Sequence, residues 1–270
     1  DKRIPAGAGL AGGSSDAAAT MRGLAQLWEV QADDEVWLSL CAQVGSDVPF
    51  FWYGGTAVVE ERGERVTPLP VQEQLTFVVA LPPVHVSTAW AYGQIRPPFP
   101  AASEYRSRVA ALRQGKMGLS EFCRRLENTF QPVVESHHPI VREVRESLLA
   151  AGATSALMSG SGSAVFGVFE CDDKAHAAVR SITEAVGGKA VGTLVQVCRA
   201  APALAKNAES ASEPHRDALA AFARFHGRAE ALRNMDEVRL AFAITIRPKQ
   251  GDSPVVAQAR MRMDEASLQG

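Results

Sequence analysis

The first part of the chain alternates apolar and polar residues at helical spacing. Apolar residues three or four positions apart follow a glycine-rich segment: Ala17, Met21, Leu24, Ala25 and Trp28. This spacing places them on one side of a helix, so we expect an amphipathic helix that begins near Ser15 or Asp16. A second helix is expected to follow Asp33 and Asp34 and to end at Gly45, because glycine often stops a helix.

Strand-like patterns come next. Residues 47–70 read DVPFFWYGGTAVVEERGERVTPLP. We expect a strand that is broken at the glycine pair 54–55, followed by a hairpin whose turn lies at 61–63. The β-rich run at 75–81 ends at two prolines and predicts another strand.

Helices and strands alternate through the rest of the first 200 residues. The serine and threonine at 87–88 are placed to cap a short helix. A helix is expected over 139–152, and the segment 155–169, SALMSGSGSAVFGVF, predicts two strands joined by a glycine loop. A further helix over 173–188 precedes a strand over 192–198. Helices that alternate with antiparallel strands predict an α+β fold with a split βαβ sandwich.

The composition changes along the chain in two places. We expect a change of domain near 71–84, where the β-rich run begins. Beyond Arg199 the residues become small and polar, which is typical of a linker. A helix is possible over 214–233, and the last 30 or so residues show no pattern from which we predict an element or a role.

Charge and cysteine content exclude several classes of function. The 270 residues carry a net charge of −2 and 46% hydrophobic residues, which indicates neither nucleic acid nor an anionic membrane as a partner. No apolar stretch reaches the ~20 residues of a membrane span. The four cysteines lie apart among apolar neighbours, as reduced thiols do: Cys41, Cys123, Cys171 and Cys198. We expect a soluble cytoplasmic protein, a monomer or weak homodimer.

The segment PAGAGLAGGSSDAAA at 5–19 carries the strongest functional signal. Consecutive backbone N–H groups without side chains can form a concave anion site, and a following helix adds the positive end of its dipole. The segment lacks the Gly-Lys-Ser/Thr of a Walker loop and the distant acidic residue of a dinucleotide site. A flexible linker or tight turn is the structural alternative, and the well-patterned helix after the serines favours phosphate binding.

This segment resembles the ATP-phosphate loop of the GHMP kinases, the superfamily of galactokinase, homoserine kinase and mevalonate kinase. Two further stretches agree, in the same order: GSDVPFFWYGGTAVVEERGERVTPL at 45–69 and LMSGSGSAVFGVF at 157–169. The extended Gly-Gly-Ser-Ser-Asp form is similar to the branch that phosphorylates the 2-hydroxyl of 4-diphosphocytidyl-2-C-methyl-D-erythritol in non-mevalonate isoprenoid synthesis.

The resemblance implies a fold and three segments. Residues 1–74 would be an incomplete GHMP N-terminal, ATP-binding domain of the kind seen in ribosomal protein S5. Residues 75–200 would be the ferredoxin-like C-terminal domain, and 201–270 a linker and tail of unknown role. ATP and Mg²⁺ are the implied cofactors.

The resemblance also implies site residues. Asp47 would be the catalytic base that takes the proton of the substrate hydroxyl, and its structural alternative is a cap on the turn at Val48 and Pro49. The triphosphate would be lined by Pro5, Ala6, Gly7, Ala8, Gly9, Leu10, Ala11, Gly12, Gly13, Ser14 and Ser15, with a serine hydroxyl near Mg²⁺. A second loop across the cleft, for substrate or phosphate, would consist of Ser159, Gly160, Ser161 and Gly162. No residue is expected to be a protein metal ligand, and Asp16 is read as a helix cap.

The sequence also departs from the family pattern. Ala11 stands where the family usually has glycine, which is tolerable if its φ stays negative. The chain opens without the strand that normally precedes such a loop, and the family's upstream lysine and Tyr-His pair are absent, so we expect weak or no activity from these 270 residues. Alternative functions are another GHMP small-molecule kinase, or a truncated protein that binds phosphate without catalysis.

Overall fold

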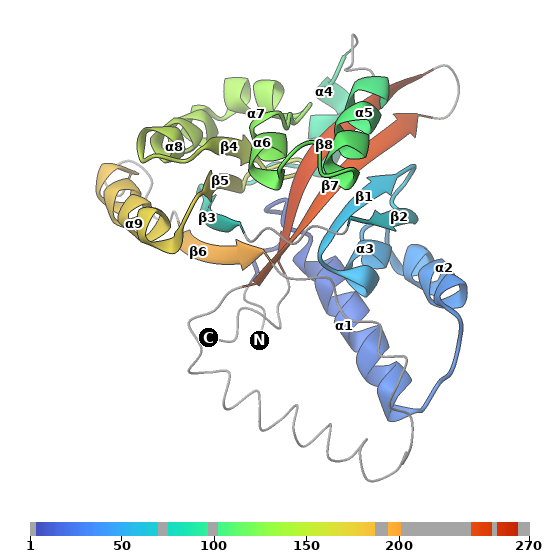
Figure 1. Cartoon of the computed structure of the whole chain (residues 1–270). Coiled ribbons are helices and arrows are strands. Elements are labelled where there is room, and N and C mark those ends of the chain that lie inside the picture. The colour runs from blue at the N-terminus through green and yellow to red at the C-terminus, as the bar shows by residue number, and fades with distance from the viewer. Residues whose placement is uncertain are drawn as a thin grey trace.

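The computed structural model describes residues 4–69, 75–96, 102–186, 194–200, 239–249 and 253–263. These residues form groups of helices and groups of strands that follow one another along the chain (Figure 1). The helices are α1 (Gly12–Leu27), α2 (Asp34–Val44), α3 (Val48–Tyr53), α4 (Thr88–Gln94), α5 (Ala102–Arg113), α6 (Leu119–Arg124), α7 (Gln131–His137), α8 (Pro139–Ala150) and α9 (Asp172–Val186). The strands are β1 (Thr56–Glu60), β2 (Arg65–Pro68), β3 (Thr76–Leu81), β4 (Ser155–Met158), β5 (Val165–Phe169), β6 (Leu194–Ala200), β7 (Arg239–Lys249) and β8 (Ser253–Met263).

The strands between residues 75 and 200 have the topology of a split βαβ sandwich. Their order in the sheet is β6-β3-β5-β4, and each neighbouring pair is antiparallel. Numbered along the chain from β3, this order is 4-1-3-2, with α9 connecting β5 to β6. The predicted α+β fold and its ferredoxin-like half are therefore confirmed.

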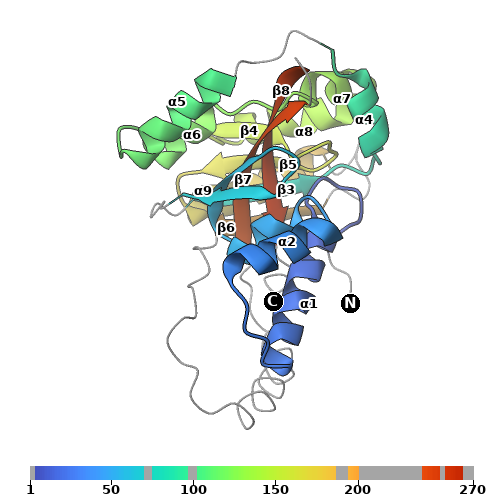
Figure 2. The ribbon, with the colours of Figure 1, turned by 90° about the vertical axis from the view of Figure 1, so that its right-hand side faces the viewer.

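Strand β3 is buried on both faces because apolar cores lie on either side of the sheet. Val78 and Ala80 face a core shared with α7, α8 and α9. Phe77 and Val79 face a second core, which includes side chains of α5 and α6. In Figure 2 α5 and α6 lie at the upper left, and α4 and α7 lie at the upper right. Alternating side chains on one strand thus hold two helical layers together.

Around β1 the helices form a third core. Ala18 of α1, Cys41 of α2 and Phe50 of α3 pack together with Ala57 and Val59 of β1. Burial raises the pKa of the Cys41 thiol, which keeps it protonated. Cys41, Cys123 and Cys171 are thiols and not disulfides, as expected from their spacing.

One expected strand is a helix. The segment before Gly54 was expected to be extended, and residues Val48–Tyr53 form α3 instead. Pro49 stands in the first turn, where its fixed φ and missing N–H suit a helix. Gly54, at φ 68°, ends the helix, and the β1–β2 hairpin with its turn near Gly63 follows as predicted.

Two strands lie where the sequence predicted no element. Strand β7 runs parallel to β1 and pairs antiparallel with β8. It also meets β6, so the β1–β2 hairpin and the ferredoxin-like strands share one sheet. In Figure 1 this long hairpin crosses the middle of the molecule. The possible helix at 214–233 lies outside the described residues, and the domain boundaries stay predictions.

Candidate active site

The glycine-rich segment that precedes α1 curls through three left-handed residues. Gly7, Gly9 and Ala11 have φ of 72°, 79° and 53°. Left-handed residues that alternate with right-handed or extended ones turn successive N–H groups toward one side, which is the geometry of an anion nest. The condition under which alanine is tolerable at residue 11, a negative φ, is not met, since Ala11 is the left-handed N-cap of the helix.

Helix α1 begins directly at this curl. The N–H groups of Ser14 and Ser15 donate to the carbonyl of Ala11 at 3.0 and 3.1 Å. Gly12 and Gly13 precede them, and the geometry of a helix start gives their N–H groups no acceptor within the helix. The helix starts three residues earlier than the apolar spacing predicts, so Asp16 lies inside the helix and is not its cap.

The second glycine loop lies against the first one. Ser159 donates through Oγ to the carbonyl of Gly9 at 2.9 Å, and the N–H of Ala164 donates to the carbonyl of Ala8 at 3.0 Å. A Cβ added to Gly9 would lie 2.2 Å from the carbonyl oxygen of Ser159. Contact at this distance requires glycine at residue 9.

The connection between β3 and α4 completes the cluster. Ser163 donates through Oγ to the carbonyl of Val84 at 2.7 Å, and the hydroxyls of Thr88 and Ser161 are 3.0 Å apart. Ser87 caps α4, as predicted, by accepting the N–H of Trp90. Three segments far apart in the sequence therefore meet: residues 5–15, 82–88 and 159–163.

Asp47 is positioned by the packing of α3 on α1. It occupies the N-cap position of α3, and its side chain makes no capping hydrogen bond to that helix. Val48 and Phe50 pack in the core that also contains Ala18 of α1. The turn cap and the catalytic role of Asp47 both stay predictions.

Two residues near these segments were not found from the sequence. Gly63, at φ 130° in the β1–β2 turn, approaches Ser46 so closely that an added Cβ would lie 1.8 Å from its carbonyl oxygen. The imidazole of His85 lies beside Gly7, 2.8 Å from the place of its missing Cβ. The glycine in EERGER at 60–65 signals a tight turn at the first residue, and nothing in the local pattern signals the contact of the second.

The described residues form a left-handed glycine curl and show no cluster of side chains for a metal ion. No group of three or more His, Cys, Asp or Glu side chains among them is arranged to hold a metal ion. No helix within the described ranges is both long and apolar enough to cross a membrane. The backbone cradle fits the phosphates of a nucleotide, and a divalent ion would have to be held with those phosphates rather than by a side-chain cluster alone.

Two family models match this arrangement. The GHMP kinases N terminal domain matches residues 1–55, and the GHMP kinases C terminal model matches residues 109–188. Both glycine loops and Asp47 fall within these matches. The chain belongs to the GHMP kinase family.

The curated relatives it matches share one activity. The 4-diphosphocytidyl-2-C-methyl-D-erythritol kinase of Citrifermentans bemidjiense is 43% identical over 188 residues, which is 69% of this chain and 64% of the relative. That of Brevibacillus brevis is 41% identical over 65% of this chain and 60% of the relative. The chain thus spans somewhat less than two thirds of the length of these relatives.

Solved structures agree on the fold. The crystal structure of a 4-(cytidine 5'-diphospho)-2C-methyl-D-erythritol kinase is 33% identical, with a TM-score of 0.53 over 68% of this chain and 65% of that chain. The homoserine kinase of Cytophaga hutchinsonii has a TM-score of 0.59 at 21% identity, covering 75% of this chain and 68% of the other. This second likeness supports the fold alone.

Proposed function

We propose that this chain is the greater part of an ATP-dependent kinase that phosphorylates the 2-hydroxyl of 4-diphosphocytidyl-2-C-methyl-D-erythritol. The observation that carries the proposal is the left-handed curl at Gly7, Gly9 and Ala11, directly before helix α1. Such a curl binds phosphate because its N–H groups and the helix dipole both favour negative charge. The identity of the substrate is inferred from the names of the curated relatives. The reaction would take place in the cytoplasm, where scattered cysteines remain reduced.

Residues 5–15 would bind and orient the ATP phosphates, so that the γ-phosphoryl group faces the substrate alcohol. The second loop, residues 159–162, would close the other side of the cradle. Mg²⁺, bound with the phosphates and a hydroxyl of Ser14 or Ser15, would neutralise part of their charge. In this class of reaction positioning and charge neutralisation supply most of the rate.

Asp47 would act as the base. A carboxylate oxygen placed beside the 2-hydroxyl can accept its proton. The hydroxyl oxygen forms a bond to the γ-phosphorus, the bond between that phosphorus and the bridging oxygen breaks, and ADP leaves. No covalent enzyme intermediate is needed.

The test measures ADP release from the purified chain with ATP, Mg²⁺ and the diphosphocytidyl alcohol, and repeats it with any in-frame upstream segment of the gene restored. Asp47→Asn is expected to lower kcat by at least ~100-fold, the usual contribution of a general base. Asp33→Asn is the matched control, because Asp33 is exposed at the start of α2 and asparagine caps a helix equally well. Competition by CDP would support this substrate over that of another GHMP kinase. The proposal is refuted if neither form of the chain binds a nucleotide and neither form releases ADP.

A further inference from the structure

The second glycine loop begins at an edge of the sheet. Strand β4 is the last strand on its side, and its final residue, Met158, leads into the loop. An edge strand presents N–H and C=O groups that no neighbouring strand satisfies. At Met158 side chains take the place of that strand: Gln131 accepts its N–H at 2.9 Å, and Asn128 donates to its C=O at 2.6 Å.

Asn128 makes three hydrogen bonds. Its Nδ2 donates to Met158 and also to the carbonyl of Gly160 at 2.8 Å, and its Oδ1 accepts the N–H of Phe130 at 2.9 Å. The side chain is 5% exposed. Both carbonyls need a donor and the N–H needs an acceptor, so this is the one amide orientation that satisfies all three groups.

The hydrogen bond from Asn128 fixes the position of the Gly160 carbonyl. Gly160 has φ of 57°, and glycine in this region loses more conformational freedom on folding than other residues do. Its neighbour Ser159 is the residue that donates to Gly9 and crowds it. A shift of Gly160 would therefore pass through Ser159 to the first glycine loop.

We infer that Asn128 is a positioning residue for the candidate nucleotide site: it fixes the second glycine loop and, through the Ser159–Gly9 contact, the anion cradle itself. The inference deepens the proposed function and rests on it for the identity of the ligand. Asn128 need not touch the nucleotide, because it acts through two backbone carbonyls.

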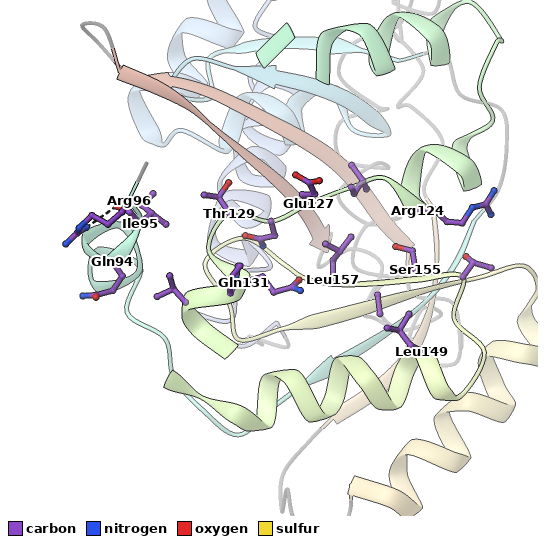
Figure 3. A pocket seen from close by; sticks show the side chains of 16 residues that line it. Gln94, Ile95, Arg96, Arg124, Glu127, Thr129, Gln131, Leu149, Ser155 and Leu157 are labelled. Carbon is purple, nitrogen blue, oxygen red and sulfur yellow. Dashed lines mark hydrogen bonds between the residues drawn. The ribbon is translucent and has the colours of Figure 1, made fainter. Parts of the chain in front are cut away.

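Asn128 also borders a cavity. Asn128 and Gln131 line a cavity of about 770 Å³ together with residues of α4, β4 and the α6–α7 segment. Figure 3 shows Gln131 and Leu157 close together on the wall of this cavity, and Gln94 on its far side. Position 128 therefore borders this cavity as well as the second glycine loop.

The decisive variant is Asn128→Asp, which keeps the size of the side chain and removes both donors. The carboxylate would face two carbonyl oxygens, so the loop must move away or the carboxyl must take up a proton. Asn128→Ser is the second variant, in case the first does not fold. Gln94→Glu is the matched control, since it makes the same chemical change on an exposed residue of the same cavity.

Two measurements separate this inference from the proposed function. Amide resonances of the glycines in both loops are compared by heteronuclear NMR, and binding of a fluorescent ATP analogue is titrated. Asn128→Asp is expected to shift the signals of Gly160, Gly7 and Gly9 and to weaken ATP binding by about tenfold or more, as loss of hydrogen bonds to a loop predicts. Gln94→Glu should change neither.

The inference is overturned if the Asn128 variants fold but leave the signals of Gly7 and Gly9 where the unchanged chain has them. If neither the unchanged chain nor the form with its upstream segment binds nucleotide, the proposed function fails, and the NMR comparison still decides whether Asn128 positions the first loop.

Discussion

Gly9→Ala is the sharpest test of the contact between the two glycine loops. A methyl group at residue 9 would lie 2.2 Å from the carbonyl oxygen of Ser159, and 3.1 Å and 3.2 Å from the carbonyl oxygen and nitrogen of Gly162. Ordinary contact begins near ~3.5 Å, so the backbones must separate by roughly 1 Å. None of the three atoms belongs to a flexible side chain that could rotate away.

The expected destabilisation has two parts. An alanine in the left-handed region costs about 1–2 kcal/mol, and overpacking against fixed backbone costs about 1–3 kcal/mol. The free energy of unfolding should therefore fall by about 2–5 kcal/mol. Gly115→Ala isolates the first part, because Gly115 has φ of 65° and open space where its Cβ would be. Gly13→Ala controls for the loss of a glycine near the helix start, since its Cβ would also meet nothing within 4 Å.

The assay is urea unfolding of the four proteins, followed by titration with a fluorescent ATP analogue. Gly9→Ala should lose more stability than Gly115→Ala and should bind the analogue at least tenfold more weakly than the unchanged chain. Equal losses in these two variants, with unchanged nucleotide affinity, would refute the contact between the loops as the basis of the site.

Three further changes test other parts of the structure. Ala11→Gly should raise the free energy of unfolding by about 0.5–1 kcal/mol, because it relieves a left-handed alanine at an N-cap; a loss of stability would contradict this conformation. Gly63→Ala should lower both stability and turnover, by pushing on the backbone of Ser46 beside the candidate base, whereas unchanged turnover would separate this turn from the site. Arg145→Met should cost about 1–3 kcal/mol, because Glu135, 6% exposed, loses two hydrogen bonds and keeps only the ion pair with Arg142 at 3.6 Å; chemical unfolding should show less loss when Glu135→Gln is added.

Most of the fold can be predicted from sequence patterns that reflect burial. The helices expected over 139–152 and 173–188 and the strand at 75–81 are confirmed, because each has one or two faces in a core. The helix expected after Asp34 also forms, although its Val36, Leu40 and Val44 are exposed. The segment at 48–53 was mistaken for a strand because its six residues are apolar on every side, and a short apolar run carries no period. Pro49 was the available signal for a helix start.

The sequence of strand β7 itself has the alternating pattern of a strand. Leu240, Phe242, Ile244 and Ile246 alternate with other residues, as in a strand. The contacts of Gly63 and His85 could not be predicted in the same way, since each depends on where the chain returns in space. Such long-range contacts leave no local pattern.

The anchoring of the glycine segment explains why the candidate site depends on the whole fold. Ile4 and Leu10, each 1% exposed, flank the curl and pack in the core that contains Phe77 and Phe166. Burial of two such side chains contributes roughly 3–6 kcal/mol, and the hydrogen bond from Ser159 to Gly9 joins residues 150 positions apart. The backbone that would bind phosphate is therefore held mainly by residues after position 75. The first 55 residues contain the recognisable motif, but they cannot form the cradle without the ferredoxin-like half.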